Sequence, residues 1–150
     1  MCNAWKSTGV AVIVACGMLS GLRAAQSRDS LYERLGGQPA VEAVAGGLVD
    51  RILADARVNR WFAHAASSPE NTAAYKAKLA EFVCQATGGP CKYTGRDMVT
   101  AHKGRAVTAE AFDAVVQDLV GVLENLKVPE KEKGQLLELL APLKASIVQK

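Results

Sequence analysis

Residues 88–102 read GGPCKYTGRDMVTAH, and they carry most of the information about the fold. Gly88, Gly89 and Pro90 should stop a helix abruptly, because glycine weakens a helix and proline cannot donate the hydrogen bond that would continue it. No sustained apolar period follows through residue 107, so we expect an ordered loop with one short helical turn over 98–103. This stretch ends on His102.

A long helix is expected directly before this stretch, over residues 69–86. Ser68 supplies the N-terminal cap, and Pro69 fits the first turn, where its missing N–H costs nothing. The apolar face of this helix consists of Tyr75, Leu79, Phe82 and Val83.

Two further helices are expected nearer the N-terminus. A capping box at Ser30 opens a short helix over 31–35, which the pair Gly36-Gly37 stops. A longer helix then starts near Pro39 and runs to about residue 54, with apolar residues at helical spacing. A turn-like segment over 58–62 follows it.

The chain after residue 107 predicts two more helices. One runs over 108–126, and Pro129 opens the other. The second carries an apolar stripe made of Leu136, Leu137, Leu140, Leu143 and Ile147. Together the segments predict one compact all-α domain over 29–148.

Composition agrees with packed helices and excludes several classes of protein. Hydrophobic residues make up 49% of the chain and aromatic residues only 5%, a balance that favours helices over sheet. The net charge of +3 comes from scattered residues, so we expect no nucleic-acid partner. No Gly-x-Ser-x-Gly, P-loop or His-Glu-x-x-His pattern occurs in the sequence.

Residues 1–25 have the layout of a secretory signal peptide. Lys6 supplies the positive charge, residues 9–22 are uncharged and apolar, and Ala24-Ala25 offer a small-residue cleavage site. The apolar part is short for a membrane span. We expect export to the periplasm and no membrane attachment after cleavage; an uncleaved anchor helix, or lipidation at Cys16, stays open as an alternative.

Export changes the interpretation of the cysteines. Cleavage would leave only Cys84 and Cys91, and an even pair close in sequence favours a disulfide in an oxidising compartment. Such a bridge would tie the end of the helix over 69–86 to the loop that delivers His102. The alternative is two unrelated thiols, one of them buried in a helix.

The chain has two histidines, His64 and His102. His64 follows Trp61-Phe62 in a polar loop, where we expect it to touch solvent. His102 lies in the irregular region between long helices, where a bundle leaves room for a ligand. A neutral imidazole there can hold haem iron while nearby cations pair with the propionates. The residues alone also leave a purely structural role open for His102.

Several motifs together resemble the group 1 truncated (2-on-2) haemoglobins. They are LYERLGG at 31–37, Gly88-Gly89-Pro90, Tyr93-Thr94-Gly95 and Met98-x-x-Ala101-His102, in that order and spacing. The resemblance covers about residues 30–148 and implies a truncated globin fold, a 2-on-2 helical sandwich around haem b (iron protoporphyrin IX). Because no CxxCH motif occurs, covalent attachment of a c-type haem is excluded.

The resemblance also implies roles for individual residues. His102 would be the proximal ligand of the iron, and Tyr75 and Leu79 would face the distal side. Lys78, Lys103 and Arg105 are candidates for pairing with the propionates. The expected haem contacts are Phe62, Tyr75, Lys78, Leu79, Phe82, Tyr93, Met98, Arg105 and Phe112.

Two positions depart from the family pattern on the distal side. Many members carry a tyrosine in the second helix that donates to bound oxygen, and here that position reads Leu48-Val49. The distal glutamine is replaced by Leu79. Losing a buried hydrogen bond of this kind costs about 1–3 kcal/mol. We expect either that Tyr75 supplies a substitute donor or that the pocket is mostly apolar.

The implied function is binding of oxygen, nitric oxide or carbon monoxide at iron held by His102. Its enzymatic variants, nitric oxide dioxygenation or a peroxidase side activity, would need an unidentified reductase or another electron donor as partner. Two alternatives remain open: an exported haem protein for electron transfer, and a haem-free helical module that binds a partner protein.

Overall fold

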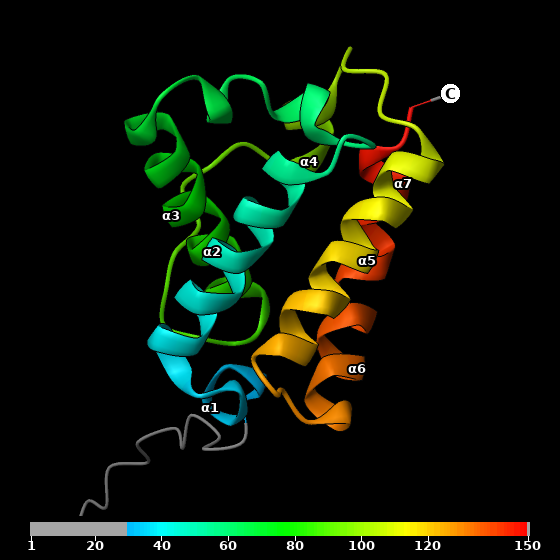
Figure 1. Cartoon of the computed structure of the whole chain (residues 1–150). Helices are drawn as coiled ribbons and strands as arrows, with labels where there is room; N and C mark the ends of the chain where they lie inside the picture. The colour runs from blue at the N-terminus through cyan, green and yellow to red at the C-terminus, as the bar shows by residue number, and fades with distance from the viewer. Residues whose placement is uncertain (1–29, 150) are drawn as a thin grey trace, which may run out of the picture.

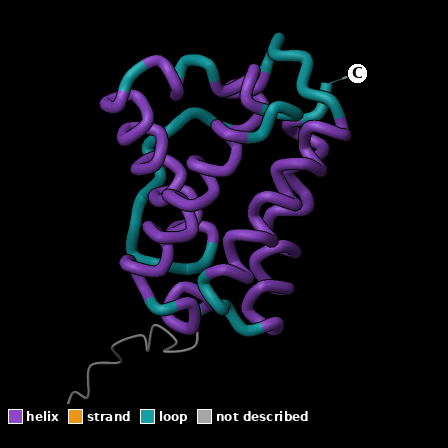
Figure 2. The backbone as a smooth tube through the Cα atoms, viewed as in Figure 1, coloured by secondary structure: helices purple, strands orange, loops and turns teal. Residues whose placement is uncertain are grey.

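The computed structural model describes residues 30–149, which form helices joined by loops, with no strand among them (Figures 1 and 2). The predicted signal peptide and its alternatives fall on residues that lie outside this range. Within the described part, none of the helices combines the length and apolar composition that crossing a membrane requires.

Long helices make up most of the domain, and short ones join or end them. The long helices are α2 (Gly37–Ala54), α3 (Pro69–Ala86), α5 (Ala109–Asn125) and α6 (Glu130–Leu140). The short ones are α1 (Leu31–Leu35), the 3₁₀ helices η1 (Asn59–Phe62) and η2 (Ala65–Ser67), α4 (Met98–His102), the 3₁₀ helix η3 (Ala141–Leu143) and α7 (Lys144–Ile147).

The long helices pair as two layers. Figure 1 shows α2 beside α3 and α5 beside α6, and α2 also packs on α5. The short helix α4 lies at the end of the domain opposite α1 and packs against α7. The predicted all-α, two-on-two architecture is therefore confirmed.

The corner between α1 and α2 is tighter than the sequence suggested. Ser30 caps α1 as predicted, and its Oγ accepts from the Glu33 amide at 3.2 Å. However, α2 begins at Gly37 rather than near Pro39. Gly36 and Gly37 both have positive φ, at 109° and 70°, a conformation that glycine adopts without steric cost. These two glycines turn the chain sharply, so that α2 begins only two residues after α1 ends. Pro39 therefore lies inside the first turn of α2.

The prediction of a single helix from Pro129 to Ile147 is wrong. α6 ends at Leu140, and the chain continues as η3 and then α7. Pro142 explains the break, because it has no N–H to donate back to the preceding turn and its ring crowds that turn. The apolar stripe survives the break, since Leu136, Leu140, Leu143 and Ile147 all line the same cavity.

A well-buried core joins α2, α3, α5 and α6. Its fully buried side chains include Val41, Ile52, Leu123 and Leu136, and full burial of such a side chain stabilises a fold by about 1.5–3 kcal/mol. Several large apolar side chains packed against this core stay only partly buried: Trp61, Phe62, Tyr75, Leu79, Phe82 and Val115. All of these line one cavity, which is the candidate site.

Candidate functional site

A cavity of about 500 Å³ is walled by α2, η1, α3, α4, α5 and the C-terminal helices. This volume lies within the range of about 300–1,000 Å³ that is typical of ligand pockets. The wall combines many aliphatic and aromatic side chains with a few polar groups. Such a wall suits a large, flat, mostly apolar ligand with polar points of attachment.

The structure brings together all the residues predicted as haem contacts, and His102 with them. The cavity lining includes Phe62, Tyr75, Lys78, Leu79, Phe82, Tyr93, Met98, His102, Arg105 and Phe112. Lys103 is exposed and does not join this lining. At the position where the resemblance expects a distal tyrosine, Leu48 lines the cavity, whereas Val49 is fully buried and does not.

Asp97 and Met98 fix the local structure around His102. Asp97 caps α4, and its Oδ1 accepts from the Thr100 amide at 2.9 Å. The Thr100 hydrogen bonds hold the pKa of the Asp97 carboxyl below its usual value, so the cap stays charged at neutral pH. One helical turn later, Nδ1 of His102 lies 2.8 Å from the Met98 carbonyl oxygen.

The bond to Met98 settles the tautomer of His102. A carbonyl oxygen can only accept, so Nδ1 must carry the proton and donate it. The neutral ring then has its lone pair on Nε2, the nitrogen that is free to bind a metal. A half-buried imidazole with one nitrogen engaged and one free is how proteins prepare a histidine ligand.

Most other polar side chains in the lining already have partners. The Trp61 indole donates to the Arg105 carbonyl at 2.9 Å, and the Tyr93 hydroxyl donates to the Arg96 carbonyl at 3.1 Å. Lys78 donates to Glu81 at 2.9 Å and also to the Thr94 hydroxyl. Within residues 30–149 the Tyr75 hydroxyl has no hydrogen-bond partner.

Tyr75 is a partly buried phenol at the cavity wall, beside other aromatic groups. Its ring meets that of Phe62 edge to face, with the centroids 5.7 Å apart. Burial raises the pKa of Tyr75 to about 12, the neighbouring Tyr93 adds to the rise, and the Arg105 charge opposes it. The hydroxyl therefore keeps its proton at neutral pH and can act only as a neutral donor or acceptor.

The two cations in the cavity wall are engaged differently. Lys78 is neutralised by Glu81, whose pKa its hydrogen bond lowers. Arg105 has no carboxylate partner within the described residues and makes only a long bond, 3.4 Å, to the Trp61 carbonyl. Of the candidates for pairing with an acidic ligand group, Arg105 is therefore the more available.

Sequence reasoning missed part of the wall. His64, expected in solvent, is exposed but also lines the cavity, and its place beside Trp61-Phe62 was the available signal. The remaining missed residues are mostly small or aliphatic, and no pattern in the sequence distinguished them from ordinary core or loop residues. They include Val44, Ala45, Ile52, Val58, Asn71, Ala74, Ala101, Val107 and Ala111.

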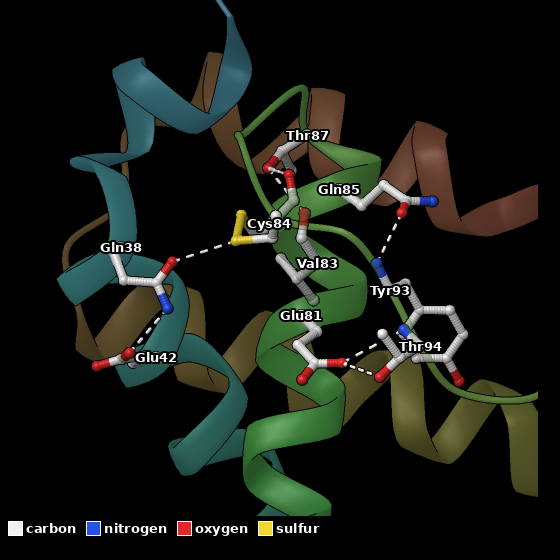
Figure 3. The surroundings of a disulfide bond; sticks show 10 residues. Gln38, Glu42, Glu81, Val83, Cys84, Gln85, Thr87, Tyr93 and Thr94 are labelled. Atoms are coloured by element: carbon white, nitrogen blue, oxygen red, sulfur yellow. Dashed lines mark hydrogen bonds between the residues drawn. A yellow bond between two sulfur atoms is a disulfide. The ribbon is translucent and has the colours of Figure 1, made fainter.

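The predicted Cys84–Cys91 disulfide is present, with the two Cα atoms 5.8 Å apart (Figure 3). Gln38 Oε1 lies 3.4 Å from Cys91 Sγ, and because a disulfide sulfur has no proton this is a contact without a hydrogen bond. A Cβ at Gly89 would lie 2.6 Å from Cys84 Sγ, so only glycine fits this corner.

Comparisons with known proteins identify what the chain is similar to. Residues 30–149 match the bacterial-like globin family. The group 1 truncated haemoglobin GlbN of Mycolicibacterium paratuberculosis is 35% identical over 118 residues, which cover 79% of this chain and 83% of that protein. The GlbN of a Synechocystis species is 37% identical over 106 residues, covering 68% of this chain and 82% of the relative.

Solved structures agree with these relatives. The Fe(III) form of the truncated haemoglobin of Tetrahymena pyriformis has a TM-score of 0.71 at 27% identity and covers 80% of this chain and 98% of its own. The 2/2 haemoglobin of a Synechococcus species, solved in the cyanomet state with covalently attached haem, has a TM-score of 0.71 at 29% identity and covers 81% and 99%.

Proposed function

The chain belongs to the bacterial-like globin family, among the group 1 truncated haemoglobins, and on this premise we propose that it binds a diatomic gas at haem iron held by His102. Haem is its cofactor, as in the globin relatives. The residues present fit this group: the cavity has a suitable volume and a mostly apolar wall, and it contains a histidine ready to act as a ligand.

The single observation that carries the assignment of the ligand is the hydrogen bond from His102 Nδ1 to the Met98 carbonyl. It leaves Nε2 unprotonated in a neutral ring at the cavity wall. His64 also reaches the cavity, but its ring has no hydrogen-bond partner within residues 30–149, so nothing sets its tautomer or orientation. His102 is therefore the better candidate of the two.

His102 would hold the haem iron, and haem would supply the metal that binds oxygen, nitric oxide or carbon monoxide. The other residues determine the surroundings. Phe62, Leu79 and Phe112 supply an apolar wall that would keep water from a bound haem and so strengthen electrostatic interactions there. Arg105 is the cation available for the carboxylates of the cofactor.

Tyr75 is our candidate for the distal hydrogen-bond donor. Val49 stands where many relatives have a tyrosine, and a valine cannot donate. The Tyr75 hydroxyl keeps its proton and has no hydrogen-bond partner among the described residues, so it is available to donate to a polar ligand in the cavity. Such a bond contributes about 1–3 kcal/mol.

We also propose that the protein works outside the cytoplasm after removal of residues 1–25. The disulfide supports this location, because such bonds form and persist in oxidising compartments. The mature protein would then begin at residue 26 and contain the globin domain over 29–148.

Haem titration of the purified chain tests the function. We expect a Soret band at one haem per chain, and ferrous protein whose spectrum changes on adding carbon monoxide. His102→Ala should lose the spectral signature of an axial imidazole, and the matched control His64→Ala should retain it. If His102→Ala kept that signature, or if the folded chain bound no haem, the proposal would be wrong.

The same preparation tests the finer expectations. Tyr75→Phe should release oxygen about tenfold faster, the change expected from a loss of about 1.4 kcal/mol, with little change for carbon monoxide. Consumption of nitric oxide by the oxygenated protein, followed with an added reductant, tests for nitric oxide dioxygenation.

A further inference from the structure

The segment that leads from α3 to α4 has no regular structure of its own. Residues 91–96 make no backbone–backbone hydrogen bond with any described part of the chain. Their conformation must therefore come from side chains. This matters for the site, because α4 has five residues and a helix this short is not stable by itself. Whatever holds 91–97 therefore also helps to fix the position of His102.

One face of the last two turns of α3 holds this segment (Figure 3). Cys84 is bonded to Cys91, Gln85 Oε1 accepts from the Tyr93 amide at 2.7 Å, and Glu81 Oε2 accepts from the Thr94 hydroxyl at 3.1 Å. The partners on α3 are Cys84 and Gln85 for the start of the segment and Glu81, one turn earlier in the helix, for Thr94. The segment thus runs antiparallel to α3, and side chains replace the missing backbone bonds.

An aromatic contact and a tight bend complete the arrangement. The Tyr93 ring meets Phe82 edge to face, with the centroids 5.3 Å apart. The Tyr93 hydroxyl reaches forward to the Arg96 carbonyl, and a Cβ at Gly95 would overlap that hydroxyl, so only glycine fits there. The bend delivers Asp97, the cap of α4.

We propose that the Cys84–Cys91 disulfide, Gln85 and Glu81 are positioning residues for His102. They hold the segment over 91–97 against α3, and this segment sets the start of α4 and hence the place of the His102 imidazole in the cavity. The proposal rests on the proposed function, because it takes His102 as the iron ligand. None of the three needs to touch the cofactor.

A merely stabilising role for these contacts predicts a different result. If the tethers only added stability, their loss would lower the melting temperature and leave the imidazole where it is. A positioning role predicts a change at His102 under conditions where the whole domain stays folded. The readouts must therefore report on His102 or on its segment directly.

Gln85 offers the sharpest test, because one substitution removes the oxygen that accepts from the Tyr93 amide and another keeps an oxygen there. Gln85→Ala deletes the acceptor for the Tyr93 amide, and Gln85→Glu keeps one at the same reach. In the full-length haem-free chain, Gln85→Ala should speed amide hydrogen exchange of residues 93–103 about tenfold, and Gln85→Glu should stay within about twofold of the parent. In the haem-loaded ferrous protein, the iron–imidazole stretching band should shift or broaden in Gln85→Ala only.

Glu132→Gln is the matched control. Glu132 pairs with Arg34 at 3.1 Å between α6 and α1, at the far end of the domain from α4. This variant should lower the melting temperature without changing the exchange of residues 93–103 or the iron–imidazole band. If Gln85→Ala behaved like Glu132→Gln, the tether would be structural only and the proposal would be overturned.

A double variant extends the test to the disulfide. Cys84→Ala with Cys91→Ala should show the same two changes as Gln85→Ala, with larger amplitude, and Gln85→Ala added to it should have a smaller further effect because both act on one segment. Unchanged readouts in the folded double variant would overturn the role of the disulfide.

Failure of the proposed function would look different. If His102→Ala retained an axial imidazole, His102 would not be the ligand, whatever the Gln85 variants did. If His102→Ala lost it and the tether variants changed neither readout, only the positioning proposal would fail.

Discussion

The segments on either side of α4 are held in contrasting ways. Before α4, residues 91–97 are fastened to α3 by a disulfide and by side-chain acceptors close by in sequence. After α4, residues 103–107 are held by distant parts of the chain: the Trp61 indole donates to the Arg105 carbonyl, and the C-terminal Gln149 bonds to both Ala106 and Val107. We call these the upstream and downstream segments.

This difference shows that the position of the His102 imidazole depends on contacts of two kinds. Those of the upstream segment are local in sequence, and those of the downstream segment depend on the overall fold. The upstream tethers join residues close in sequence, so little chain entropy is lost in closing them. The downstream segment includes Gly104 and Ala106 at positive φ, 73° and 49°, and a non-glycine residue keeps such a conformation only where its surroundings enforce it. It therefore depends on η1 and the C-terminus being in place.

Removing the upstream covalent tether should have the largest effect. Cys84→Ala with Cys91→Ala should lower the free energy of unfolding by about 2–3 kcal/mol, the value that the chain-entropy model gives for so short a loop. Haem should still bind, because the downstream segment remains held. Urea denaturation with and without haem measures the free energy of unfolding and the retention of haem. The control is the parent chain reduced with a dithiol. Equal stabilities of the oxidised parent and the variant would contradict the prediction.

Weakening the main downstream bond should come next. Trp61→Phe keeps an aromatic ring but removes the indole donor to the Arg105 carbonyl, so the free energy of unfolding should fall by about 1 kcal/mol. Hydrogen exchange should quicken in residues 103–107 and stay unchanged in 91–97. Equal acceleration in both segments would show that they form a single unit.

The C-terminal bond should matter less. Gln149→Ala removes the acceptor for the Ala106 amide, which is exposed and can bond to water instead. We expect a loss of about 0.5 kcal/mol, at the low end for a hydrogen bond. Thermal unfolding detects it, with Gln149→Glu as the variant that keeps an acceptor. A loss as large as that of Trp61→Phe would mean that the C-terminus is the main downstream tether.

The pKa of Tyr75 compares the two segments in one measurement. Its phenol should titrate near pH 12, and the upstream Tyr93 raises this pKa whereas the downstream Arg105 lowers it. Tyr93→Phe should therefore move the titration to lower pH and Arg105→Gln to higher pH, by small amounts. Phenolate absorbance measures this in the haem-free chain, and Tyr75→Phe identifies the signal.

The same shift has a consequence for stability. The unfolded phenol ionises near pH 10 and the folded one near 12, so the folded state keeps a proton that the unfolded state has lost. The free energy of unfolding should fall as pH rises through this window, and Tyr75→Phe should remove that part of the fall. An unchanged slope in Tyr75→Phe would contradict the raised pKa.

Local features of the sequence predicted the bounds of helices and also the disulfide. Ser68 and Pro69 at one end and Gly88-Gly89-Pro90 at the other predicted the observed bounds of α3, because caps and breakers act on neighbouring backbone groups. The expectation of export, with Cys84 and Cys91 an even pair close in sequence, predicted the disulfide, and the resemblance to truncated haemoglobins implied the residues that line the cavity. The error at Pro142 came from giving the apolar stripe more weight than a proline inside it.

Contacts between distant residues were decided only by the tertiary structure. No pattern in the sequence tells that Gln149 reaches Ala106, that Trp61 donates to the Arg105 carbonyl, or that Thr94 joins the Lys78–Glu81 pair. Nor does any pattern tell that Arg105 has no carboxylate partner among the described residues. These pairings depend on where whole helices pack. Local propensity acts over a few residues, whereas the packing of the helices determines which polar groups of this cavity become hydrogen-bond partners.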